Sequence, residues 1–163
     1  MVLKKIVLFL SLTSLCLKFN AQNYGVGIGF YPTGVEAGLG LRTSKNNLFF
    51  ADIRVTKANL YTNPSLGLLV NEASAVFRIV QYDKVRLHLG IGARTEWNFT
   101  PNQQSRYGFI TPLGVEAFPF PFQNAGLFFE TGFYTTFSAD KTVNLGLRSV
   151  AGFVFYFIKK EKV

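Results

Sequence analysis

The feature that most constrains the fold of this chain is a strict alternation of apolar and polar residues over long segments. From Val85 to Trp97, the odd positions are Val, Leu, Leu, Ile, Ala, Thr and Trp, and the even positions are Arg, His, Gly, Gly, Arg and Glu. Successive side chains of a β-strand point to opposite faces, so this spacing predicts one strand with two chemically different faces. Its length is about twice that of an ordinary soluble strand and suits a tilted strand that spans a bilayer.

The same period recurs along the chain, and turn-forming residues separate the repeats, as in Tyr31–Thr33 and Gln81–Lys84. Eight such segments predict an all-β fold, an eight-stranded antiparallel up-and-down transmembrane β-barrel. The predicted strands are Tyr24–Phe30, Gly34–Arg42, Leu48–Thr56, Leu66–Val80, Val85–Trp97, Tyr107–Phe118, Ala125–Phe137 and Asn144–Phe157. An even number of strands places both chain ends on the same side of the membrane.

The N-terminus is predicted to be a secretory signal peptide over residues 1–21. Lys4 and Lys5 precede an apolar run from Ile6 to Leu17, and the small residue Ala21 marks the expected cleavage site. The run is too short for an uncleaved anchor helix, because a bilayer core of about 30 Å needs about 20 apolar residues. Residues 22–163 are then a single outer-membrane β-barrel domain, exported to the outer membrane of a Gram-negative cell.

The only cysteine, Cys16, lies within the predicted signal peptide, so the mature chain is expected to hold no disulfide and no cysteine metal site. A lipoprotein that is lipidated at Cys16 is the alternative, but Leu15 stands where a small residue is expected. Without the signal-peptide lysines the chain has 14 basic and 9 acidic residues, and this excess is too diffuse to indicate nucleic-acid binding.

The placement of the charged residues predicts which face of the strands lies inside. Six arginines and six acids lie within the predicted strands, whereas most lysines lie in turns or the C-terminal tail. The planar guanidinium pairs well with carboxylates in confined sites, so a charge-balanced lumen network is expected. The predicted lumen residues are Glu36, Arg42, Asp52, Arg54, Glu72, Arg78, Arg86, His88, Arg94, Glu96, Glu116, Glu130 and Arg148. The apolar face then meets outer-membrane lipid.

Aromatic residues are expected to form two girdles at the membrane interfaces. Those near the predicted external ends are Phe30, Tyr31, Tyr61, Trp97, Phe99, Tyr107 and Phe137. Those near the periplasmic ends are Tyr24, Tyr82, Phe118, Phe120, Phe122, Phe155 and Phe157. The alternative is a soluble secreted lipocalin-like binding barrel, in which the apolar face would point inward and the polar face to water.

The segment Thr111–Glu116 (TPLGVE) and the signal end Ala21-Gln22 resemble uncharacterised outer-membrane barrel proteins of the Bacteroidota. The chain as a whole resembles small outer-membrane barrels of the OmpA/OmpX type. The resemblance implies insertion by the barrel-assembly machinery, with a C-terminal assembly signal in which Gly152, Phe155 and Phe157 match the family pattern. Val150 departs from it, since a polar residue is expected there, and the chain continues past the final aromatic residue.

The expected function is that of a structural or surface-binding protein rather than an enzyme or a wide pore. Eight strands enclose only enough space for side chains to fill, and no cofactor or metal site is predicted. Loops 57–65 and 98–106 are the expected contacts for an external protein or ligand. The alternative enzyme, a lipid-modifying hydrolase, would depend on His88, but Gly90 stands where its serine would be expected.

Overall fold

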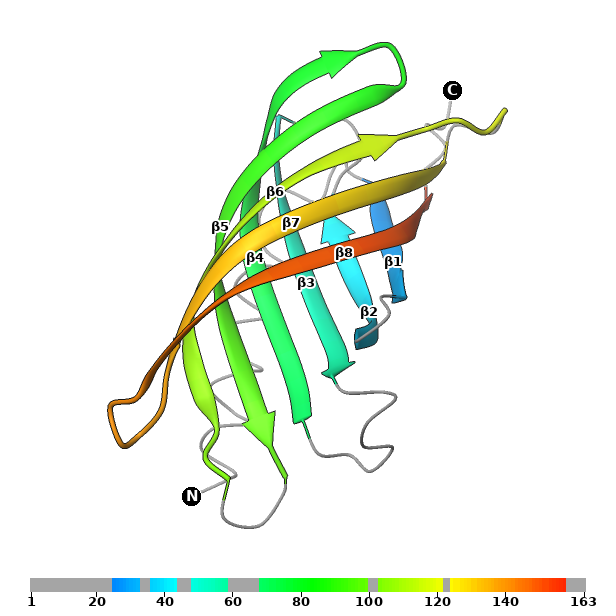
Figure 1. The fold of residues 1–163 in the computed structure, drawn as a ribbon. Coiled ribbons are helices and arrows are strands. Elements are labelled where there is room, and N and C mark those ends of the chain that lie inside the picture. The colour runs from blue at the N-terminus through cyan, green and yellow to red at the C-terminus, as the bar shows by residue number, and fades with distance from the viewer. Residues whose placement is uncertain are drawn as a thin grey trace.

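The computed structural model of the chain, which describes residues 25–32, 36–43, 48–58, 68–99, 103–121 and 124–157, is a closed barrel of eight antiparallel strands (Figure 1). Each strand pairs with its neighbours in the sequence, and β8 closes the barrel by pairing with β1. This confirms the predicted all-β, up-and-down architecture. The strands are β1 Val26–Pro32, β2 Glu36–Thr43, β3 Phe49–Ala58, β4 Leu68–Tyr82, β5 Val85–Asn98, β6 Arg106–Ala117, β7 Ala125–Phe137 and β8 Val143–Phe157.

Some sequence predictions fall outside the described residues: the signal peptide 1–21, residues 59–65 and 100–102 of the two loops, and the aromatic residues Tyr24, Tyr61 and Phe122. Within the described residues, no helix is long and apolar enough to cross a membrane.

The two ends of the barrel differ in the connections that they carry. At one end, called here the terminal end, β1 begins, β8 finishes and the β4–β5 turn lies; this turn is at the top of Figure 1. The opposite end, called the loop end, carries the β5–β6 connection and the β7–β8 turn, which projects at the lower left of Figure 1. Both described chain ends therefore lie at the terminal end, as the even strand number predicted.

The bounds of two predicted turns were wrong, because the strands extend into them. Tyr31 and Pro32 belong to β1 and pair with β2, and proline is tolerated there because Pro32 is the last residue of its strand. At the other end of the barrel, β4 continues to Tyr82, and the turn contains only Asp83 and Lys84. Asp83 has φ 49°, a left-handed conformation that Asp tolerates in tight hairpins.

The sheet is irregular at two places that simple alternation did not predict. The β4–β5 register shifts between Arg78 and Val80, so Ile79 and Val80 both lie on the exposed face, as expected for a β-bulge. In β6, Pro112 has no N–H to donate to the ladder. The pairing of β5 with β6 accordingly runs through Leu89↔Leu113 and resumes at Gly92↔Ile110.

The two faces of the barrel wall have opposite chemistry. Large apolar residues cover the outside, where Phe109 and Leu145 are 63% and 73% exposed. The inside holds charged and aromatic side chains, among which Arg42 and Glu130 are completely buried. This distribution is the reverse of that in a soluble barrel, whose apolar residues face inward.

Interior glycines make room for aromatic rings in the narrow barrel. Tyr31 points inward between Gly29 and Gly40: a Cβ at either glycine would lie 2.6–2.7 Å from the nearest atom, which at Gly29 is the Tyr31 hydroxyl. A side chain on either glycine would push this ring out of its place. The glycine-rich sequence of β1 thus makes room for interior side chains.

Candidate functional site

The barrel interior is organised around Asp52, which projects inward from β3. The Arg42 Nε donates to its Oδ2 at 2.9 Å, and the Arg54 Nη2 donates to the same oxygen at 2.8 Å. The Tyr31 hydroxyl donates to Oδ1 at 3.2 Å. Asp52 is 1% exposed, so its negative charge is compensated by two guanidinium groups and not by solvent.

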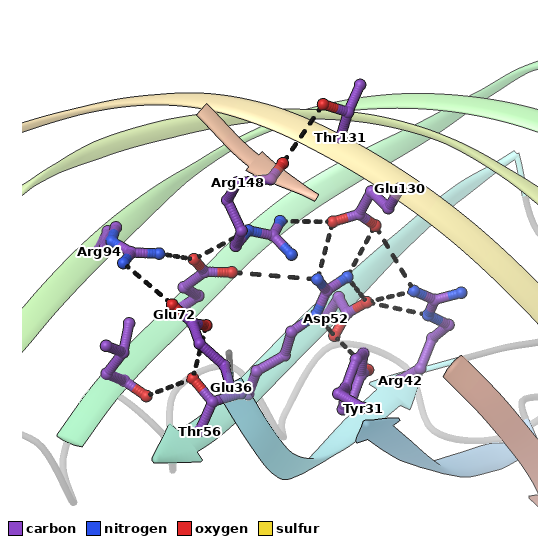
Figure 2. Close-up of polar contacts among 12 residues, drawn as sticks. Tyr31, Glu36, Arg42, Asp52, Thr56, Glu72, Arg94, Glu130, Thr131 and Arg148 are labelled. Carbon is purple, nitrogen blue, oxygen red and sulfur yellow. Dashed lines mark hydrogen bonds and ion pairs between the residues drawn. The ribbon is translucent and has the colours of Figure 1, made fainter. Parts of the chain in front are cut away.

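Glu130 of β7 is the second centre and faces Asp52 across the barrel (Figure 2). Both of its oxygens accept hydrogen bonds from Arg54, each at 2.7 Å, in a bidentate pair. The Arg148 Nη2 donates to Oε1 at 2.6 Å, and the His88 Nε2 lies 3.2 Å from Oε2. Arg54 thereby connects Asp52 of β3 with Glu130 of β7, two strands that are not neighbours in the barrel.

Toward the loop end the network continues through Glu72 and Arg94. The Arg94 Nη1 lies 2.6 Å from Glu72, and its Nε donates to Glu96 at 2.9 Å. Arg148 reaches Glu72 at 3.2 Å and so links this part to Glu130. Glu36 lies 3.8 Å from Arg94, accepts from the Thr56 hydroxyl at 3.3 Å, and is the least buried of these residues.

Toward the terminal end the network is centred on Glu116. Its Oε1 accepts from Arg42 at 3.1 Å and from the Tyr156 hydroxyl at 2.7 Å. Arg78 and Arg86 each lie 3.9 Å from its Oε2. This end is the more basic part of the interior.

These contacts place all thirteen residues of the sequence-derived lumen set in one connected network. Every member except Glu36 is at most 7% exposed. Six acids stand against six arginines, with His88 beside Glu130, so the interior is nearly neutral. Near-neutrality matters because an unpaired charge in a confined site costs several kcal/mol.

Sequence reasoning missed the aromatic side chains that share the interior with the charges. The Arg94 guanidinium lies 4.2 Å from the centre of the Tyr134 ring, and Arg54 lies 4.6 Å from that of Tyr31. Such cation–π contacts stabilise arginines beyond their ion pairs. Part of the signal was present in the sequence: Tyr134 has the same parity as Glu130 in β7, whereas β1 has no charged residue, and Tyr31 shares the parity of its inward-facing glycines. The interior aromatic residues include Tyr31, Phe50, Phe118, Phe128, Tyr134 and Tyr156.

The prediction that Tyr31 and Phe118 belong to the aromatic girdles was therefore wrong. Tyr31 is completely buried against Asp52, and Phe118 packs inside against Tyr156. Both lie near strand ends, but their parity turns them inward. Phe99, Tyr107, Tyr82 and Phe157 do lie on the outside, each more than half exposed.

The residues of the expected C-terminal assembly signal lie where β8 closes the barrel. Phe155 and Phe157 point outward, with ring centres 5.6 Å apart, and pair with Ile28 and Val26 of β1. Gly152 lies inward beneath the Phe128 ring.

His88 contacts the Glu130 carboxylate and lies edge-on to the Phe50 ring, with the ring centres 5.8 Å apart. It is 1% exposed and lies in the middle of the ion-pair network, so its surroundings are those of a structural residue. Among the described residues, no group of three or more His, Cys, Asp or Glu side chains is arranged to hold a metal ion.

A polar pocket of about 500 Å³ lies at the loop end, between the β5–β6 connection and the β7–β8 turn. The Asp140 N–H of the turn donates to the Gln104 side-chain oxygen at 3.3 Å, which joins the two connections. Hydrogen bonds from the Ser138 hydroxyl and from the Thr142 backbone hold the pKa of Asp140 below its usual value, so its carboxylate is charged at neutral pH.

Loop 98–106 contributes to this pocket through Asn98, Gln103, Gln104 and Arg106. Of the second predicted loop, 57–65, only Lys57 and Ala58 are described. Sequence reasoning missed the contribution of the β7–β8 turn to this pocket, because a turn of five residues gives no signal that it will meet another loop.

Comparison of the chain with protein-family models, with curated proteins and with solved structures gave no match, so its function is argued from the geometry of its own residues.

Proposed function

We propose that this protein is an integral outer-membrane β-barrel that is exported by its signal peptide, has an interior filled by side chains, and acts as a structural or surface-binding protein through its loop end. The observation that carries the proposal is the reversed chemistry of the wall, which is apolar outside and charged inside.

The outer surface supports a lipid environment. All eight strands contribute exposed Leu, Ile, Val or Phe side chains to it, so the apolar surface surrounds the barrel. Soluble monomers rarely expose contiguous apolar patches larger than a few hundred Å². In a bilayer this apolar surface would contact the apolar lipid chains. Barrel closure leaves no unpaired strand edge in contact with lipid.

The exposed aromatic residues support the same environment. Phe99 and Tyr107 lie at the loop end, and Tyr82 and Phe157 at the terminal end, all directed outward. Aromatic rings at both rims are typical of membrane barrels, where they lie at the level of the headgroups. The loop end then faces the medium and the terminal end the periplasm.

Membrane fractionation with a heat-modifiability gel tests the proposal. The chain is expected in the outer-membrane fraction, and the folded barrel should migrate differently in unboiled and boiled samples. A mature chain that folds in plain buffer without lipid and stays in the soluble fraction would instead establish the lipocalin-like alternative.

The filled interior leads to a second expected result. The side chains of Arg42, Glu116 and Glu130 are 0–1% exposed, so they close the middle of the barrel. Reconstitution into planar bilayers is expected to give no steady conductance of nanosiemens magnitude, whereas a porin with 16 to 18 strands measured alongside would conduct. Steady currents of that size would contradict the filled interior.

A further inference from the structure

The loop-end pocket has the size of a small-molecule site. Its volume of about 500 Å³ lies within the range of about 300–1,000 Å³ that is usual for ligand pockets. Eight of its nine lining residues have polar or charged side chains, and they come from strand ends of the barrel and from two separate connections. The closed interior lies beneath it, so a ligand would enter from the loop end.

The two acids of the pocket already have partners in the protein. The Glu96 Oε1 accepts from the Arg94 Nε at 2.9 Å. The Asp140 Oδ1 accepts from the Ser138 hydroxyl and from the Thr142 N–H. The Glu96 carboxylate is therefore paired with a cation, and the exposed Asp140 carboxylate is stabilised by hydrogen bonds within its turn.

Arg106, unlike these two acids, has no partner among the described residues. It is the first residue of β6, is half-buried, lines the pocket, and makes no hydrogen bond or ion pair with another described residue. Glu96 is its register partner on β5, but that carboxylate is bound to Arg94. Within the described part of the chain no carboxylate accepts from this guanidinium, so its donors remain available to the pocket.

Two amide groups add donors beside Arg106. The Gln103 side-chain oxygen accepts from Asn98, and the Gln104 oxygen accepts from the Asp140 N–H. Because the oxygens are used, the NH₂ group of each glutamine is left to donate. Arg106, Gln103 and Gln104 together form a set of donors that matches an anionic group.

We propose that this pocket binds a hydroxylated monocarboxylate, the chemistry of a uronic acid sugar. This inference rests on the proposed function, because the loop end must face the medium for such a ligand to reach it. The guanidinium fork matches a carboxylate in two parallel hydrogen bonds. Glu96 and Asp140 line the same space and disfavour a dianion such as phosphate, and the polar walls offer partners for hydroxyl groups.

The proposed ligand class is tested by titration calorimetry of the folded chain in detergent micelles. The probes are D-glucuronate, D-glucose and inorganic phosphate. Glucuronate is expected to bind, and glucose and phosphate at least tenfold more weakly. Arg106→Gln should lower the glucuronate affinity about tenfold or more, since a charge-assisted bidentate pair is lost. Lys141→Gln is the matched control: it removes one positive charge from the neighbouring turn, outside the pocket lining, and should change the affinity less than twofold.

Three results would overturn the site: no glucuronate binding, equal binding of glucose, or an affinity that Arg106→Gln leaves unchanged. Phosphate binding more tightly than glucuronate would overturn the ligand class. Failure of the membrane proposal is separately visible, because a chain that folds in buffer without lipid could still be titrated with the same probes. Each variant is first checked for its heat-modified shift, so that loss of the fold is not counted as loss of binding.

Discussion

Replacement of Glu130 by Gln is expected to destabilise the folded barrel by about 3–5 kcal/mol, the usual cost of removing one partner from a buried charge network. Glutamine has nearly the same shape, so the change removes charge without opening a cavity. Arg54 and Arg148, which donate to Glu130 at 2.6–2.7 Å, would be left with an uncompensated positive charge inside the barrel. The network would lose the acid that contacts side chains from β2, β3, β5 and β8.

The measurement is the free energy of unfolding in urea of the barrel folded into lipid vesicles, followed by the fluorescence of Trp97, the only tryptophan. Asp83→Asn is the matched control: it removes one negative charge from an exposed turn where Asn tolerates the left-handed backbone, and should change stability by less than about 0.5 kcal/mol. If Glu130→Gln were as stable as the unmodified chain, the ion pairs would contribute little.

A double-mutant cycle distinguishes charge pairing from general damage. Arg148→Met removes one of the cations that pair with Glu130 and keeps most of the side-chain volume. Since the two residues are in direct contact, the double variant should lose less stability than the sum of the single variants, by about 0.5–3 kcal/mol. Additive losses would mean that the two changes act independently.

Replacement of Leu89 by Arg is expected to cost about 2–4 kcal/mol for folding into vesicles, because an arginine on the lipid face near the midplane has neither water nor a partner. Leu89, the fifth of the 14 residues of β5, points outward, with Phe77 and Leu113 opposite it on the neighbouring strands. The measurement is the free energy of folding into vesicles of defined thickness.

Two neighbouring variants make the Leu89 result specific. Gly90→Ala faces the interior, where a Cβ would lie 2.8 Å from the Ala75 carbonyl oxygen and 3.0 Å from Pro112; overpacking should cost about 1–3 kcal/mol. Lys84→Glu, in the exposed β4–β5 turn, should change stability by less than about 0.5 kcal/mol. A chain that folds in plain buffer, and whose Leu89→Arg variant fails there, would overturn the membrane assignment.

The alternation in the sequence was sufficient to predict the number of strands, their order and the face on which each charged residue lies. It succeeded because strand parity is a local property, and because short connections allow each strand to pair only with the next. Arg94 and Glu96 could be placed on one face of β5 in this way. Strand ends were less accurate, since Pro32 and Tyr82 remain paired despite turn-forming residues close by.

Only the tertiary structure decided which charges meet. Arg54 pairs with Glu130, 76 residues away, and Arg42 with Glu116, 74 residues away. Parity fixes the face of a side chain but not its height along the barrel axis, which depends on the stagger between strands when the barrel closes. The same stagger brings Arg106 and the β7–β8 turn to one pocket. The sequence alone therefore determined which charged side chains lie inside this barrel, and closure of the barrel determined how the interior is connected.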